Sequence, residues 1–196
     1  GSHLTRSGVD VRVVAPTGRV ARMRHAGTLL PTVSIPAYGR PDYRVSLFLP
    51  IRVRRTIGRF DPDIVHVATP DFIGLWAILW ARRTGRIVVG SYHTHFVSYL
   101  GHYHLDWGAG IVWSWIRAVY NRCHEVYATS PAMVETLSLH RVNNVKLWSR
   151  GIDTKLFHPD KRSLPWRRKW GFSDEDVLVA FVGRLVKEKN LSLFAR

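Results

Sequence analysis

The residues best suited to chemistry lie near the carboxyl end, in the segment VGRLVKEKN. Arg184 follows an apolar run that ends at Gly183, and Lys189 comes five residues later, where a helix is expected to begin. Ligands bind at the carboxyl ends of parallel strands, and a helix N-terminus adds free N–H groups and a positive dipole end. Arg184 supplies a planar fork of donors, and Lys189 supplies a mobile point charge. The spacing predicts a diphosphate site; the alternative is a solvated basic loop, which Lys187 and Glu188 would suit.

Histidines raise the separate question of a metal site. His93, His95, His102 and His104 lie close together in the chain. Neither His-x-His pair has the i, i+4 spacing of helical ligands, and no nearby Cys or Glu completes a ligand set. We therefore expect no metal and no other cofactor. His66 lies in the middle of a predicted strand, where a core or rim position is expected.

Short β-branched runs alternate with longer helical segments over the first three-quarters of the chain. Strands are expected at Val11–Ala15, Thr32–Ile35, Ile64–Ala68, Ile87–Ser91, Val126–Thr129 and Val145–Trp148, and helices at Leu49–Phe60, Phe72–Arg83, Asp106–Cys123 and Met133–Leu139. Continuous apolar strands that alternate with helices indicate a parallel sheet covered on both faces. The predicted class is therefore doubly wound α/β, with most tryptophans packed in the core.

The chain changes character after Trp148. Residues 151–175 contain two prolines and a basic patch, which predicts an interdomain linker with a short helix. Asp176–Val182 is expected to be a buried strand outside the first sheet, followed by a helix that begins near Asn190. The chain also opens on what is expected to be the end of a helix, stopped by Gly8. Both ends therefore look cut, and Gly1–His3 suits either a tag remnant or native sequence.

The charge points to an anionic partner. The chain has 29 Lys and Arg against 14 Asp and Glu, a formal charge of +15, which suits nucleic acid, an acidic membrane or a phosphorylated substrate. The single cysteine, Cys123, excludes an internal disulfide framework and suits a reducing cytosol. No transmembrane span or secretory signal is visible, so a cytoplasmic location is expected.

The segment Leu49–Phe60 is expected to be a basic helix. Apolar residues alternate in it with four arginines: Arg52, Arg54, Arg55 and Arg59. Such a helix suits contact with an anionic membrane surface, which would place the protein at the inner face of the membrane. A helix with one face on the sheet and the other in water explains the pattern equally well.

The segment VGRLVKEKN resembles the donor-binding segment of the family-4 glycosyltransferases. Four further segments resemble motifs of the same family and occur in the family's order. They are GVDVRVVAP (8–16), FDPDIVHVATP (60–70), SYHTHF (91–96) and LWSRGIDTKLFHP (147–159). The resemblance extends to bacterial and plant enzymes that place hexoses on lipids, among them GDP-mannose-dependent α-mannosyltransferases and sulfoquinovosyl transferases. It implies the GT-B fold. Residues 1–150 would form the acceptor-side Rossmann-like domain without its first strand, 151–175 the linker, and 176–196 the truncated start of the nucleotide-sugar-binding domain.

The resemblance also implies roles for individual residues. Arg184 and Lys189 would hold the donor diphosphate, together with Gly183, and do the work that a metal does in other classes. His93 would lie beside the transferred sugar, with His95 as a further cleft candidate, and Gly151 and Asp153 would lie at the domain junction. The family's Glu-x7-Glu motif should lie beyond Arg196, so the fragment alone is expected to be inactive.

The leading functional hypothesis is an enzyme that moves a hexose from a nucleotide diphosphate sugar to a lipid or glycan acceptor with retention of configuration. A nucleic-acid-binding module is a second hypothesis, but the basic residues are scattered and the aromatic residues lie in predicted core helices. A non-catalytic remnant of the fold is a third.

Overall fold

The computed structural model describes residues 2–17, 28–37, 40–94, 97, 106–149, 151–183, 185 and 190–194. It divides into two compact units, Gly1–Ser149 and Arg150–Arg196, and each is described here by itself. None of the described helices is both long and apolar enough to span a bilayer.

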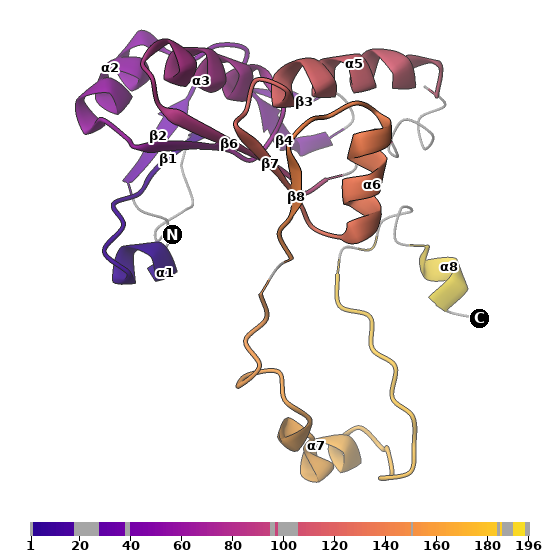
Figure 1. Cartoon of the computed structure of the whole chain (residues 1–196). Helices are drawn as coiled ribbons and strands as arrows, with labels where there is room; N and C mark the ends of the chain where they lie inside the picture. Colours follow the sequence, from indigo (N-terminus) through magenta and orange to yellow (C-terminus); the bar gives the residue numbers. More distant parts are fainter. Residues whose placement is uncertain are drawn as a thin grey trace. The chain divides into compact units, whose positions relative to one another are not determined.

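The first unit is built around a parallel four-stranded sheet (Figure 1). Its strands are β5 (Ile64–Val67), β6 (Ile87–Tyr92), β7 (Glu125–Ala128) and β8 (Val145–Leu147), in that spatial order. The connecting helices are α3 (Phe72–Arg83), α5 (Ala109–Tyr120), which a short 3₁₀ turn η1 (Asp106–Gly108) precedes, and α6 (Pro131–Leu139). The parallel α/β prediction is confirmed.

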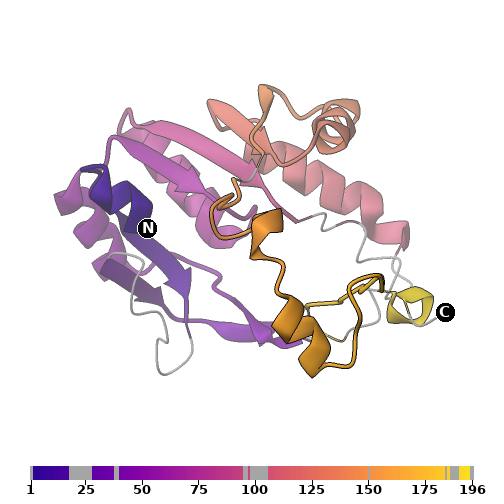
Figure 2. The ribbon, with the colours of Figure 1, turned by 90° about the horizontal axis from the view of Figure 1, so that it is seen from below.

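The three helices pack on one face of the sheet. Right-handed crossovers that always step in the same direction place their helices on the same side. Side chains from that face, such as Val88 and Val126, join Ile78, Ile116 and Leu137 of the helices in one buried cluster. Figure 1 shows α3 and α5 above the strands, and Figure 2 gives the view from below. These three helices therefore cover one face of the four-stranded sheet.

Helix α5 approaches β6 closely because Gly90 has no side chain. A Cβ at Gly90 would lie 2.7 Å from Cδ1 of Tyr120, which is fully buried. The Tyr120 hydroxyl donates to the carbonyl oxygen of Ser91 at 2.9 Å. Helix and strand are thus joined where the strand approaches its carboxyl end.

A second, smaller group of strands lies at the amino-terminal end. β1 (Arg12–Pro16) pairs in parallel with β2 (Thr28–Thr32), and β3 (Ile35–Ala37) pairs antiparallel with β4 (Arg40–Val45). Helix α1 (Ser2–Arg6) precedes Gly8, which has φ +78° and ends the helix as expected. Helix α2 (Ile51–Phe60) buries Val53, which packs with Leu49 and Ile73.

Two expectations for this end of the chain are wrong. Val11–Ala15 does not belong to the large sheet, because its strand pairs with β2 in a separate sheet. Thr32–Ile35 is not one strand, since β2 ends and β3 begins within it; prolines in β2, β3 and β4 hid these strands.

The tryptophans are less buried than expected. Trp113 is 8% exposed, but five of the eight exceed 40%: Trp76, Trp107, Trp148, Trp166 and Trp170. Four of these five lie outside the long helices α3 and α5, in short helices or connecting segments.

Among the described residues of the second unit there are three short helices: η2 (Pro159–Lys161), α7 (Leu164–Lys169) and α8 (Leu191–Phe194). Buried Arg167 donates to the carbonyl oxygens of Ser173 and Asp176, at 2.9 and 2.5 Å, which ties α7 to the next segment. Asp176–Val182 lies outside the first sheet as predicted, but it is not a strand. A strand needs a hydrogen-bonded neighbour, none of the described residues provides one, and Val177 is 90% exposed.

Candidate active site

Polar and aromatic side chains gather on the face of the sheet opposite its helices. The register pairs His66 with Val89, Ser91 with Tyr127, and Tyr127 with Lys146. Paired residues in neighbouring strands point to the same face, and residues two apart within a strand do so as well. His66, Ser91, Tyr127 and Lys146 therefore share one face, with His66, Ser91 and Tyr127 near the carboxyl edge, where parallel sheets bind ligands.

His66 and Ser91 form the closest pair in this group. The Nε2 atom of His66 lies 2.5 Å from the Ser91 hydroxyl. Burial of the His66 imidazole, and secondly the nearby His93, lower its pKa below the usual value of 6.5. His66 is therefore neutral at pH 7. The Ser91 side chain is fully buried, so this pair is not an exposed nucleophile and base.

Trp148 connects the carboxyl ends of three strands. Its ring centre lies 6.0 Å from His66, 6.1 Å from His93 and 5.6 Å from Tyr127. The Trp148 amide donates to the carbonyl oxygen of Ala128 at 2.8 Å, which holds the residue immediately after β8 against β7. The indole is 50% exposed. An exposed indole flanked by two imidazoles offers an apolar surface with polar groups at its margin, the composition of small-ligand sites.

Glu125 is the acidic side chain on this face of the strands, and it is already paired. Its carboxylate accepts a hydrogen bond from Tyr127 at 2.5 Å and forms an ion pair with Lys146. These hydrogen bonds, first that of Lys146, lower the Glu125 pKa. Glu125 is therefore ionised at neutral pH and unsuited to act as a general acid.

The structure brings one predicted site residue into this cluster. His93 follows the last residue of β6 and lies beside Trp148 and His66. Sequence reasoning placed His66 in the core or at its rim and gave Trp148 no role. The sequence signals were a polar residue, His66, within an apolar strand and the spacing of two between Glu125 and Tyr127, but only the register shows that these residues share a face.

The other predicted site residues belong to the second unit or lie outside the described residues. Gly151, Asp153 and Gly183 are exposed, and one Asp153 carboxylate oxygen accepts from the amides of Lys155 and Leu156, both at 3.0 Å. Asp153 thus stabilises a local turn. Three residues lie outside the described part of the chain: Arg184, Lys189 and His95.

Metal ligands are a separate question. Within the ranges that the structure describes, no three His, Cys, Asp or Glu side chains gather in a metal-binding arrangement. His95, His102 and His104 are not among those residues, so their relation to His93 stays a prediction.

Comparison with known protein families gives a match over most of this chain. A model of Glycosyltransferase Family 4 matches residues 1–156. These residues include the four-stranded sheet and the group formed by His66, His93 and Trp148. The chain belongs to this family. Its membership confirms the resemblance seen in the sequence motifs.

Several curated proteins are similar to this chain over almost its whole length. A GDP-mannose-dependent alpha-mannosyltransferase of Corynebacterium glutamicum is 33% identical over 98% of this chain and 48% of its own length. One of Mycolicibacterium smegmatis is 34% identical over 98% of the chain and 52% of its own length. A sulfoquinovosyl transferase of Arabidopsis thaliana is 30% identical over 97% of this chain and 38% of its own length. The chain spans about half the length of these bacterial relatives.

Proposed function

We propose that the complete protein transfers a hexose from a nucleotide diphosphate sugar to a lipid or glycan acceptor with retention of configuration. Family membership over residues 1–156 is the observation that carries this proposal. Mannose carried by GDP is the first donor to test, because the bacterial relatives reported above are named for it. Sulfoquinovose is the second, from the plant relative.

The site geometry supports a binding role for the face at the carboxyl edge of the sheet. His93 offers a hydrogen-bonding imidazole next to the exposed Trp148 ring. Imidazole and indole groups can contact the hydroxyl groups and the C–H face of a hexose. We assign His93 to the transferred sugar, with His66 and Trp148 orienting it.

The reaction in this proposal uses charge stabilisation instead of a protein nucleophile. The bond between the anomeric carbon and the diphosphate oxygen breaks, the acceptor oxygen bonds to that carbon on the same face, and the acceptor proton leaves with the diphosphate. Arg184 and Lys189 would meet the charge that develops on the leaving group, so no metal is required. Glu125 is held by Lys146 and Tyr127, which leaves it unsuited to attack the sugar.

Contact with a membrane surface is part of the same proposal. In α2, Val53 is buried, whereas the four arginines at 52, 54, 55 and 59 are exposed. Their exposure leaves the positive face available to anionic lipids, which would bring the enzyme to a lipid acceptor.

The test is transfer by the full-length protein. It would be incubated with GDP-mannose and a lipid extract, with and without EDTA, and products would be identified by mass spectrometry and their anomeric configuration by NMR. We expect an α-linked product in both conditions. Transfer that strictly requires a divalent metal, or an inverted product, would contradict the mechanism. Donor binding without transfer to any acceptor would favour a non-catalytic remnant.

A further inference from the structure

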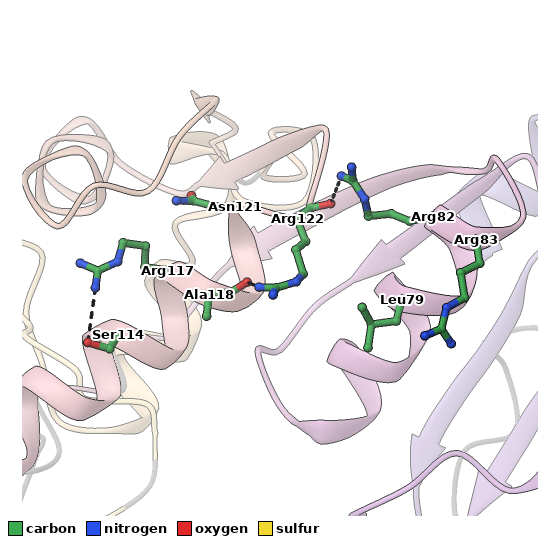
Figure 3. A pocket seen from close by; sticks show the side chains of 8 residues that line it. All are labelled: Leu79, Arg82, Arg83, Ser114, Arg117, Ala118, Asn121 and Arg122. Carbon is green, nitrogen blue, oxygen red and sulfur yellow. Dashed lines mark hydrogen bonds between the residues drawn. The ribbon is translucent and has the colours of Figure 1, made fainter.

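A basic cleft lies between α3 and α5, away from the candidate active site (Figure 3). It is open to solvent and has a volume of about 780 Å³. Arg82 and Arg83 line it from the end of α3, and Arg117 and Arg122 line it from α5 and the turn that follows. Ser114 adds a hydroxyl group to the same surface.

The cleft belongs to the opposite edge of the sheet from His93. Arg82 and Arg83 precede β6, and Arg122 precedes β7, so these side chains lie at the amino edge. β6 has six residues, and a strand rises by about 3.3 Å per residue. About 20 Å of strand therefore separates the cleft from the carboxyl edge. One small ligand could not occupy both places.

The positive charge in the cleft is not neutralised by the described protein. None of its lining residues is acidic, and none of the four arginines forms an ion pair within the described ranges. Helix C-termini carry about half a negative charge each. Two such ends offset roughly one of the four positive charges, so a net positive field remains.

Two of the arginines have a structural explanation and two are more open to a ligand. Arg82 donates to the carbonyl oxygen of Arg122 at 2.9 Å, and Arg122 donates to that of Ala118. Arg117 makes only a long contact of 3.4 Å with Ser114. Arg83 has no hydrogen-bond or ion-pair partner among the described residues. A guanidinium group with few protein partners can donate two parallel hydrogen bonds to a pair of phosphate oxygens.

We propose that the α3–α5 cleft binds a phosphate or pyrophosphate group of a ligand other than the sugar donor. The group can belong to a soluble phosphorylated compound or to a phospholipid headgroup, since the guanidinium groups recognise the same oxygens in both. This inference rests on the cleft itself and is independent of the proposed transferase activity.

The test uses the full-length protein with Arg184→Ala and Lys189→Ala, which removes the competing donor site. Pyrophosphate and inorganic phosphate are titrated calorimetrically at constant ionic strength, with chloride as the reference anion. Arg83→Gln with Arg117→Gln should weaken pyrophosphate binding about a hundredfold, on the basis of about tenfold for each lost guanidinium. Arg168→Gln, an exposed charge in α7, is the matched control and should change affinity less than twofold.

A second arm identifies the source of the phosphate group. Vesicles of phosphatidylcholine with phosphatidic acid are compared with pure phosphatidylcholine, and binding by the parent is compared with binding by the double variant, so that any contribution of α2 cancels. If the parent binds pyrophosphate and the double variant does not, the ligand is a soluble phosphorylated compound. If the parent binds only vesicles with phosphatidic acid and the double variant does not bind them, the ligand is a lipid headgroup. Equal binding by parent and double variant in both arms, or no binding in either, overturns the proposal. Arg83→Gln alone provides the test if the double variant does not fold.

Discussion

Gly90→Ala should destabilise the first unit by acting on the contact between α5 and β6. The new Cβ would lie 2.7 and 2.8 Å from two ring atoms of Tyr120 and 3.2 Å from the sulfur of Cys123. Tyr120 is 0% exposed and Cys123 is 5% exposed, so neither side chain can turn into solvent. Overpacking of this kind costs about 1–3 kcal/mol. At about 2–4 °C per kcal/mol for a chain of this size, the Tm should fall by about 2–12 °C.

Gly58→Ala is the matched control for this prediction. Gly58 lies within α2, is exposed, and would place its Cβ in open space. Alanine favours a helix interior over glycine by about 0.5–1 kcal/mol, so the Tm should rise slightly. Both variants would be measured by thermal unfolding followed by circular dichroism. If Gly90→Ala unfolds at the temperature of the parent, the close packing of α5 on β6 is refuted.

Three further predictions concern the site and the surface. His93→Ala in the full-length enzyme should lower turnover while folding is kept, and more than His95→Ala does; the reverse ranking would show that the loop is misplaced. The lowered pKa of His66 means that the unfolded chain binds its proton more readily, so stability should fall as the pH drops below about 6.5. His66→Asn should flatten that part of a pH series of unfolding free energies, and an unchanged slope would contradict the assignment. Binding to liposomes should rise with anionic lipid and fall with salt, because charges are screened beyond about 8 Å at physiological ionic strength, and neutralising the exposed arginines of α2 should abolish the difference.

Much of the secondary structure follows from local patterns. The helix prediction Phe72–Arg83 coincides with α3, where Asp71 accepts from the Gly74 amide at 2.7 Å and begins the helix. Glycines, prolines and capping residues act over a few neighbours, so they can be read from the sequence. The strand prediction for Asp176–Val182 failed because hydrophobicity indicates burial only where a partner exists.

The candidate site was less accessible to sequence reasoning. His93 could be predicted from its place at a strand end and from a family motif. The association of His66 with Ser91 and Trp148 depends on the register of strands that are 25 and more residues apart in the chain, which local patterns do not determine. The cleft between α3 and α5 was missed because its arginines are spread over two helices.

The central proposal is that Arg184 and Lys189 bind the diphosphate of the donor, and the binding of a donor analogue tests it most directly. GDP affinity of the full-length protein would be measured by calorimetry with and without EDTA, for the parent and for Arg184→Ala, Lys189→Ala and Lys187→Ala. We expect Arg184→Ala and Lys189→Ala to bind GDP more weakly and to lose about two orders of magnitude in kcat/KM, whereas Lys187→Ala stays close to the parent. Arg184→Lys should restore only part of the affinity, because a point charge cannot reproduce the guanidinium fork. EDTA should have no effect on the parent. Unchanged affinity in both alanine variants, or loss of parental binding in EDTA, would contradict the account.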